Sequence, residues 1–339
     1  MRTRIVGIAA IGTLAVCGTA LTPPATGSST LAEREHRAEN TAIQPGSLDK
    51  GKRPQALYMQ GRRIYDGKRA FKVRGPKGLS LVGKGDGGYL AVRYGMYDGH
   101  LWQIRPHRKA RRLGGVAQAA YNGGDRYTVS DDGKRLAITE PERTGKEMLW
   151  VRALPSGKQL RFRWRVGGTR AVAFPKNRVL LTNLAETYWY APKQNKRTFV
   201  TDSTAVLAEP GANRMVLLGS EPGEDNFRLV AFDETSTLLA GWNKGRPLVT
   251  SPNGKRFLAK VGKHKLQVRS LDDGAVVRTF SAAGRIDTAS ARWESGRRVL
   301  FTAKGHKVAA NVRCTVGGDC VRTTRLVKRP GQLGIDWPQ

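Results

Sequence analysis

The sequence predicts an all-β protein, a seven-bladed β-propeller of four-stranded antiparallel blades, with six blades as the alternative number. Three observations support this prediction. The stretch Arg246–Ser281 contains four short segments with strand character, joined by three tight turns, which is the content of one propeller blade. The same pattern recurs along the chain at a near-constant spacing. The 339 residues include 40 glycines, which suits a fold with many turns.

The turns within Arg246–Ser281 have hairpin chemistry. Residues 251–254 read Ser-Pro-Asn-Gly, in which proline fixes one φ angle and Asn-Gly tolerates the left-handed conformation of tight turns. Gly262–His264 and Asp272–Gly274 supply the other two turns. Residues 266–270 alternate with the period of two that is typical of a strand.

Copies of this unit can be aligned on Arg256. The aligned positions are Tyr89, Arg135, Arg178, Arg214, Arg256 and Arg298, and consecutive positions are 36 to 46 residues apart. A period of this length, with strand-turn-strand content in each copy, indicates radial repetition. A β-sandwich is the competing architecture, but a sandwich has no reason to repeat its turn sequence at one period.

Two of the turns resemble a known repeat family. Ser251–Ala259 and Ser130–Ala137 are similar to the S-P-D-G-K-x-L-A signature of the WD-repeat, YVTN-type and TolB-type bacterial propellers. The resemblance covers about residues 80–326 and implies a propeller fold. None of the seven tryptophans is followed by aspartate, so the signature dipeptide of eukaryotic WD repeats is absent. The resemblance therefore does not imply a WD-type scaffolding role.

Residues 1–30 are predicted to be a signal peptide. Arg2 and Arg4 precede the short apolar stretch Ile5–Val16, and small residues follow at Gly18–Ala20. A retained membrane anchor is the alternative, although the apolar stretch is at or below the length that spans a bilayer. We expect a secreted or cell-envelope protein with no transmembrane domain in its mature form.

The three cysteines fit an exported chain. Cys314 and Cys320 flank a Gly-Gly-Asp turn, so antiparallel strands would bring them within reach of a disulfide, which an oxidising compartment favours. Two unpaired thiols in a cytoplasmic protein are the alternative. Cys17 follows Leu-Ala-Val, which resembles a bacterial lipobox, but a small residue usually stands where Val16 does. Lipidation of Cys17 is therefore a second alternative to simple signal removal.

Residues 31–54 are poor in large apolar side chains and are predicted to be a disordered linker. The propeller is expected over residues 55–339. Gln55–Val73 contains three strands of a seventh blade, and the C-terminal Leu333–Trp337 can supply the missing one. Pairing the two chain ends in one blade closes the ring without exposed strand edges.

No strong catalytic motif is present, and the five histidines, at positions 36, 100, 107, 264 and 306, are scattered. We expect no cofactor and no metal. A solvated hairpin tip is favoured over a calcium site for the acidic loop Glu221–Asp225. Core packing is favoured over ligand stacking for Tyr188–Tyr190. The rival to a non-catalytic binding module is a propeller hydrolase or lyase, which needs convergent acidic or histidine groups at the central channel.

Charge is the one global functional signal. The chain carries 59 Lys and Arg against 27 Asp and Glu, a net charge of +32. Cations such as Arg161, Arg163 and Arg165 can protect outer strands from edge pairing, but mixed charges would keep a chain soluble as well. The excess predicts binding of anionic polymers (teichoic acid, lipid headgroups or extracellular DNA) or of a protein partner, by a monomer. One basic turn is the candidate site: Arg105, His107, Arg108, Lys109, Arg111 and Arg112.

Overall fold

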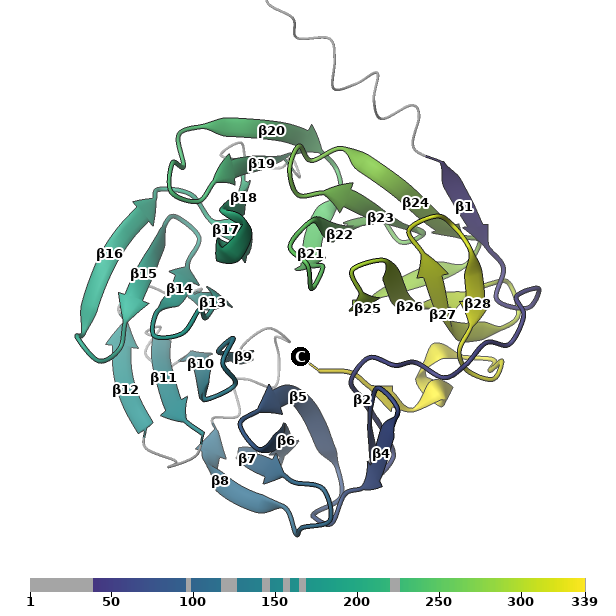
Figure 1. The fold of residues 1–339 in the computed structure, drawn as a ribbon, viewed down its shortest axis with the longest axis horizontal. Helices are drawn as coiled ribbons and strands as arrows, with labels where there is room; N and C mark the ends of the chain where they lie inside the picture. Colours follow the sequence, from purple (N-terminus) through teal and green to yellow (C-terminus); the bar gives the residue numbers. More distant parts are fainter. Residues whose placement is uncertain are drawn as a thin grey trace, which may run out of the picture.

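The protein is a seven-bladed β-propeller, with seven sheets arranged around a central axis (Figure 1). The computed structural model describes residues 39–95, 99–116, 127–141, 147–154, 159–164, 169–219 and 226–338. The predicted fold class is confirmed, and the six-bladed alternative is wrong. The predicted signal peptide, residues 1–30 with Cys17, lies outside the described residues.

Six blades follow one another along the chain, each running from the channel outwards. Blade 1 has β5 (Leu79–Gly85), β6 (Gly88–Tyr94), β7 (Gly99–Ile104) and β8 (Arg111–Val116). Blade 2 has β9 (Tyr127–Val129), β10 (Arg135–Pro141), β11 (Glu147–Ala153) and β12 (Gln159–Trp164). Blade 3 has β13 (Arg170–Ala173), β14 (Val179–Thr182), β15 (Thr187–Ala191) and β16 (Lys196–Thr201).

Blade 4 has β17 (Ala205–Glu209), β18 (Arg214–Leu218), β19 (Asn226–Ala231) and β20 (Leu238–Asn243), with the 3₁₀ turn η2 (Pro210–Ala212) after β17. Blade 5 has β21 (Arg246–Thr250), β22 (Arg256–Val261), β23 (Lys265–Ser270) and β24 (Val276–Ala282). Blade 6 has β25 (Arg285–Ser295), β26 (Arg298–Lys304), β27 (Ala309–Thr315) and β28 (Cys320–Arg322).

Blade 7 is built from both ends of the described chain, as predicted. Its strands are β29 (Ile335–Asp336), β2 (Tyr58–Gln60), β3 (Arg63–Asp66) and β4 (Arg69–Lys72), and η3 (Pro330–Leu333) precedes β29. The innermost strand β29 pairs with β2 in antiparallel register. The described chain therefore ends at the centre of the ring (Figure 1).

The two turns that carry the repeat signature fold in the same way. Ser130 Oγ donates to Asp132 Oδ1 at 2.6 Å and accepts from the Arg135 amide at 2.9 Å. Ser251 Oγ makes the equivalent bonds, at 2.8 and 3.0 Å. The glycine of each turn has positive φ, which glycine adopts at little steric cost. Turn sequence and turn conformation thus repeat together.

The arginine that follows these turns joins one blade to the next. Arg135 Nη1 donates to the carbonyl of Lys176 in blade 3, and Arg256 Nη1 donates to the carbonyl of Gly296 in blade 6, at 3.3 Å. All six aligned positions of the repeat lie within one residue of the beginning of a blade's second strand. The repeat period seen in the sequence is therefore the blade period.

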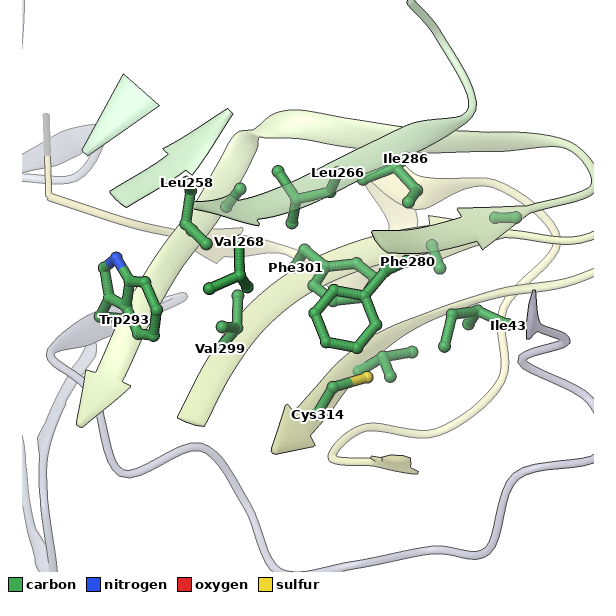
Figure 2. Packing of buried hydrophobic residues seen from close by; sticks show 14 residues of the cluster. Ile43, Leu258, Leu266, Val268, Phe280, Ile286, Trp293, Val299, Phe301 and Cys314 are labelled. Atoms are coloured by element: carbon green, nitrogen blue, oxygen red, sulfur yellow. The ribbon is translucent and has the colours of Figure 1, made fainter. Parts of the chain in front are cut away.

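Neighbouring blades pack through buried apolar side chains. Figure 2 shows the cluster between blades 5 and 6, where the rings of Phe280 and Phe301 lie 5.6 Å apart, centroid to centroid. Tyr188–Tyr190 in β15 is buried as well, with its rings in the clusters on either side of blade 3. The prediction of core packing for these aromatic residues is confirmed.

The prediction of a disordered linker over residues 31–54 is wrong for residues 39–54, and residues 31–38 lie outside the described chain. β1 (Asn40–Ile43) adds a fifth strand to blade 5, parallel to β24. Two features order it: its backbone pairs with the outer edge of β24, and the Ile43 side chain, 1% exposed, fills the cluster between blades 5 and 6. We call residues 39–55 the N-terminal strap.

A buried ion pair holds the far end of the strap. Arg313 donates to both carboxylate oxygens of Glu294, and its Nη atoms also donate to the carbonyls of Lys52 and Arg53, at 3.2 and 2.8 Å. The Gln55 amide donates to Glu294 Oε1 at 2.6 Å. One paired carboxylate in blade 6 therefore fixes the chain before it enters blade 7.

Cys314 and Cys320 form the predicted disulfide across the hairpin between β27 and β28. Within the described residues, no helix has the length and apolar character needed to cross a membrane.

Candidate ligand-binding site at the channel mouth

The central channel contains a cavity of about 970 Å³ whose lining extends from blade 3 to blade 7. Its walls come mainly from the innermost strands β17, β21 and β25 and from η3 with the C-terminal segment 335–338, and Arg170 of β13 also contributes. The size is that of an ordinary small-molecule site. The cavity is thus bounded by the same C-terminal residues that close the ring.

An enlarged bulge in β25 projects into this cavity. Most first strands of the blades skip one residue in their pairing with the second strand, for example between Pro247 and Val249 in β21. In β25 the pairing passes from Asp287 to Arg292 while β26 advances only from Thr302 to Leu300. The residues between them, 288–291, all line the cavity. Bulges of this kind re-aim side chains and are frequent beside functional sites.

Arg292 holds the bulge and the C-terminus together. Its Nε donates to the carbonyl of Ser290 at 3.0 Å, and Nη1 donates to the carbonyl of Pro338 at 3.4 Å. Its guanidinium lies 4.2 Å from the centre of the Trp337 ring. Burial lowers the pKa of Arg292 to about 9, partly opposed by the nearby carboxylates of Asp336 and Asp287. Arg292 is therefore a structural clamp in the channel wall.

Asp336 fixes the same segment from the other side. Its Oδ2 accepts from the Leu81 amide of blade 1 at 2.7 Å. Burial raises the pKa of Asp336 to about 6, against the opposing effects of that amide and of Arg292. Among the described residues that line the cavity, Asp287 and Asp336 carry the acidic groups. The three or more convergent acidic or histidine groups expected of a hydrolase or lyase are not found among them.

Cations collect at one mouth of the channel. Because strands within a blade are antiparallel, the beginnings of the first and third strands and the ends of the second and fourth lie on one face. On this face of blades 4 to 6 the side chains form a basic arc: Lys244, Arg246, Lys260, Lys263, Lys265, Arg285, Lys304 and Lys307. Lys304 is half-buried and the others are exposed.

Strand register shows that the arc is continuous. Arg246 lies directly opposite Lys260 in blade 5, and both line the cavity. Arg285 lies directly opposite Lys304 in blade 6. The Ile286 amide of blade 6 donates to the carbonyl of Lys263 at 2.9 Å, which joins the two blades at the arc.

The arc cations are not used in folding. In the part of the chain that the structure describes, none of the ion pairs involves them, and their side chains make no hydrogen bond. Like charges directly opposite each other in a sheet destabilise it. Two such pairs, Arg246 with Lys260 and Arg285 with Lys304, therefore cost stability at the channel mouth.

The basic turn predicted from the sequence lies elsewhere. Residues 105–110 connect the third and fourth strands of blade 1, so they lie on the face opposite the arc. Arg111 Nη2 donates to Gln103 Oε1 at 3.1 Å, and Arg112 Nη2 lies 3.0 Å from His100 Nδ1. His107, Arg108 and Lys109 are exposed, whereas Arg105 is half-buried. Polymer binding by this turn stays a prediction.

Other sequence-based candidates are only partly described. Arg161 and Arg163 lie on β12, the outermost strand of blade 2, which is where edge protection was expected. Arg165 and the acidic loop Glu221–Asp225 lie outside the described residues. The arc itself was missed, although its residues were visible: aligning strand ends across consecutive blades would have placed them on one face.

The comparisons with known proteins support the fold alone. No protein-family model matches the chain, and no curated protein matches it in sequence. Oligogalacturonate lyase from Vibrio parahaemolyticus aligns with a TM-score of 0.56 at 10% identity, over 81% of this chain and 89% of that one. An uncharacterized protein from Listeria monocytogenes aligns at 0.51 and 12% identity, over 84% and 87%.

A third structure, Hsv2 from Kluyvelomyces marxianus, aligns at 0.50 and 10% identity, over 79% and 92% of the two chains. At such low identity these likenesses carry no information on ligands. The repeat family suggested by the two signature turns stays a resemblance.

Proposed function

We propose that the chain is an exported, non-catalytic binding propeller that holds a flexible anionic polymer of the cell envelope at the basic arc. The observation that carries the proposal is the arc itself: cations without described partners, two pairs of them directly opposed in register, at the mouth of a cavity. An unpaired cluster that costs stability is best explained by a ligand that neutralises it.

Net charge supports the same proposal. A field of one sign attracts polyanions over long distances and accelerates their association. Each phosphate that a lysine or arginine neutralises releases counterions, so such binding falls steeply with salt. Wall teichoic acid, a flexible single chain, is the polymer we favour, and duplex DNA and anionic lipid vesicles are comparison ligands.

Two triple variants with the same change in charge test the location of the site. Lys260, Lys263 and Arg285 are replaced by Gln in one, and Arg108, Arg111 and Arg112 by Ser in the other. Affinity for teichoic acid is measured in roughly 50 and 200 mM salt, the range over which phosphate contacts lose most affinity. With a slope of about 0.7 per contact on a single strand, loss of three contacts should lower the salt slope by about 2.

We expect the arc variant to lose more affinity than the turn variant. Equal losses in both would mean that binding follows net charge and not the arc. Absence of binding by the wild-type chain at the lower salt would end the proposal. Any loss in the turn variant measures the contribution predicted for Arg105–Arg112.

Export is part of this proposal and is tested separately. Mass spectrometry of the protein recovered from the medium or envelope should show an N-terminus beyond residue 17. A lipid-modified Cys17 would replace free secretion by membrane attachment, and an intact N-terminus would contradict export by signal cleavage.

A further inference from the structure

The sign of the charge changes from the channel mouth inwards, and this change indicates which chemical groups the ligand must have. Arg285 begins β25 at the mouth, and Asp287 follows two residues later, about 7 Å farther in at the usual strand rise. The bulge at residues 288–291 comes next. A cationic rim therefore gives way to a carboxylate and then to the bulge.

Two polar groups in this second layer are available to a ligand. Thr288 lines the cavity, and its hydroxyl makes no hydrogen bond with the described residues. Asp287 Oδ1 accepts from the Ala289 amide at 3.3 Å, and no described group donates to Oδ2. Arg292 and Asp336, by contrast, are occupied in holding the C-terminal segment.

The second layer accepts hydroxyl groups and repels anions. An ionised carboxylate has only acceptor sites, and a hydroxyl can fill one of them by donating. Such charge-assisted bonds are stronger than neutral ones. An anionic group would be repelled by Asp287 but attracted by Arg246 and Lys260 of the lining and by Arg285 at the beginning of β25.

We infer that the cavity takes the hydroxyl-bearing end of an anionic chain, a polyol phosphate or an acidic saccharide, with its anionic group at the arc and its hydroxyls at Asp287 and Thr288. This inference rests on the proposed function and adds the ligand class to it. A polyanion without hydroxyls would bind the arc and stop at the mouth.

Small probes on the full-length chain test the inference by calorimetry at low salt. Glucose 6-phosphate and glucuronate are the hydroxylated anions, one with a phosphate and one with a carboxylate. Two further probes each carry only one of the two features: inorganic phosphate has the anionic group, and glucose has the hydroxyls. We expect at least one hydroxylated anion to bind about tenfold more tightly than either inorganic phosphate or glucose, since a hydrogen bond to a charged group is worth that much. Which of the two hydroxylated anions binds more tightly identifies the anionic group as phosphate or carboxylate.

Two variants identify the residues. Thr288→Val preserves shape and removes the hydroxyl, and Asp287→Asn removes the charge while keeping an acceptor for the Ala289 amide. Both substitutions should lower the affinity for the hydroxylated anion, by about fivefold or more when combined. The affinity for inorganic phosphate should stay unchanged or rise slightly. Should Asp287→Asn disturb the bulge, Thr288→Val alone provides the test, because its hydroxyl has no described structural bond.

The outcomes separate this inference from the proposed function. If teichoic acid binds but neither hydroxylated anion binds more tightly than inorganic phosphate, the inference is wrong and the arc remains a polymer site. Equal weakening of inorganic phosphate and sugar phosphate by the two variants would also overturn it. If teichoic acid does not bind at all, both the inference and the proposed function are refuted.

Discussion

Replacing Arg313 by Ala should release the N-terminal strap and destabilise the whole propeller. The Glu294 side chain, only 2% exposed, is paired through both of its oxygens with Arg313. The substitution would leave a buried carboxylate with the Gln55 amide as its remaining described partner. It would also remove the donors that hold the carbonyls of Lys52 and Arg53.

The expected cost is large because the pair is buried. Removing one partner of a buried ion pair typically costs about 3–5 kcal/mol, since the other charge is left without compensation. An ordinary domain has a stability of only about 5–15 kcal/mol, so the variant should unfold at a much lower denaturant concentration. Replacing both Glu294 and Arg313 by Met should cost less than Arg313→Ala alone, because no unpaired charge then remains.

Urea unfolding followed by tryptophan fluorescence measures these free energies. Lys84→Ala is the matched control, because Lys84 is 62% exposed in its ion pair with Asp66 and should contribute at most about 1 kcal/mol. Trypsin gives a local readout, since the chain should be cleaved after Lys50 and Lys52 earlier in the Arg313 variant than in the wild type. A loss below about 1 kcal/mol for Arg313→Ala would refute the argument that this buried pair anchors the strap.

Two further perturbations test the ends of the chain. Replacing both Cys314 and Cys320 by Ser should lower the free energy of unfolding by about 2 kcal/mol. This is the loop entropy expected for a disulfide with a sequence separation of 6. An unchanged urea midpoint in non-reducing buffer would contradict this prediction. Burial raises the folded-state pKa of Asp336 to about 6, above its unfolded value near 4. The folded state therefore binds this proton more tightly, so Asp336 stabilises the fold at low pH, and this stabilisation is lost as pH rises through about 6. Asp336→Asn should therefore show a flatter stability profile between pH 4 and pH 6, and identical profiles for wild type and variant would rule out this titration.

The fold could be predicted because the repeat unit carries its own turn chemistry. Ser130 and Ser251 cap their turns with equivalent hydrogen bonds, and the arginine after each turn donates to a backbone carbonyl at the equivalent position of the next blade. Each copy of the turn sequence therefore forms the same turn at the same place in its blade, so the repeat can be recognised from the sequence. The seventh blade was predictable from the need to close the ring.

The N-terminal strap could not be predicted in the same way. Residues 39–55 have few apolar side chains, and composition alone indicates disorder. Their order comes from an unpaired edge at β24 and from a buried pair, Glu294 with Arg313, more than 200 residues away. Such partners are non-local, so no pattern within the segment reveals them.

The candidate site was missed for a related reason. The turn at residues 105–112 is one dense basic run, whereas the arc residues are spread over positions 244–307 in several short groups that strand register and blade packing bring together. The β25 bulge is invisible in a period-two pattern, because it appears only as a mismatch with β26. A single basic run was recognised in the sequence, and a basic surface assembled from several short segments of neighbouring blades was not.

The two faces of the propeller use their cations differently, and this difference narrows what the net charge of +32 means. On the face of the signature turns, Arg135 and Arg256 are consumed in bonds between blades. In the channel wall, Arg292 is consumed in holding the C-terminus. At the opposite mouth, the arc cations have no such described partner and face one another in register. The cations are therefore not spread evenly over the surface. Some of them hold the fold together, and those left for a ligand are concentrated where the cavity opens.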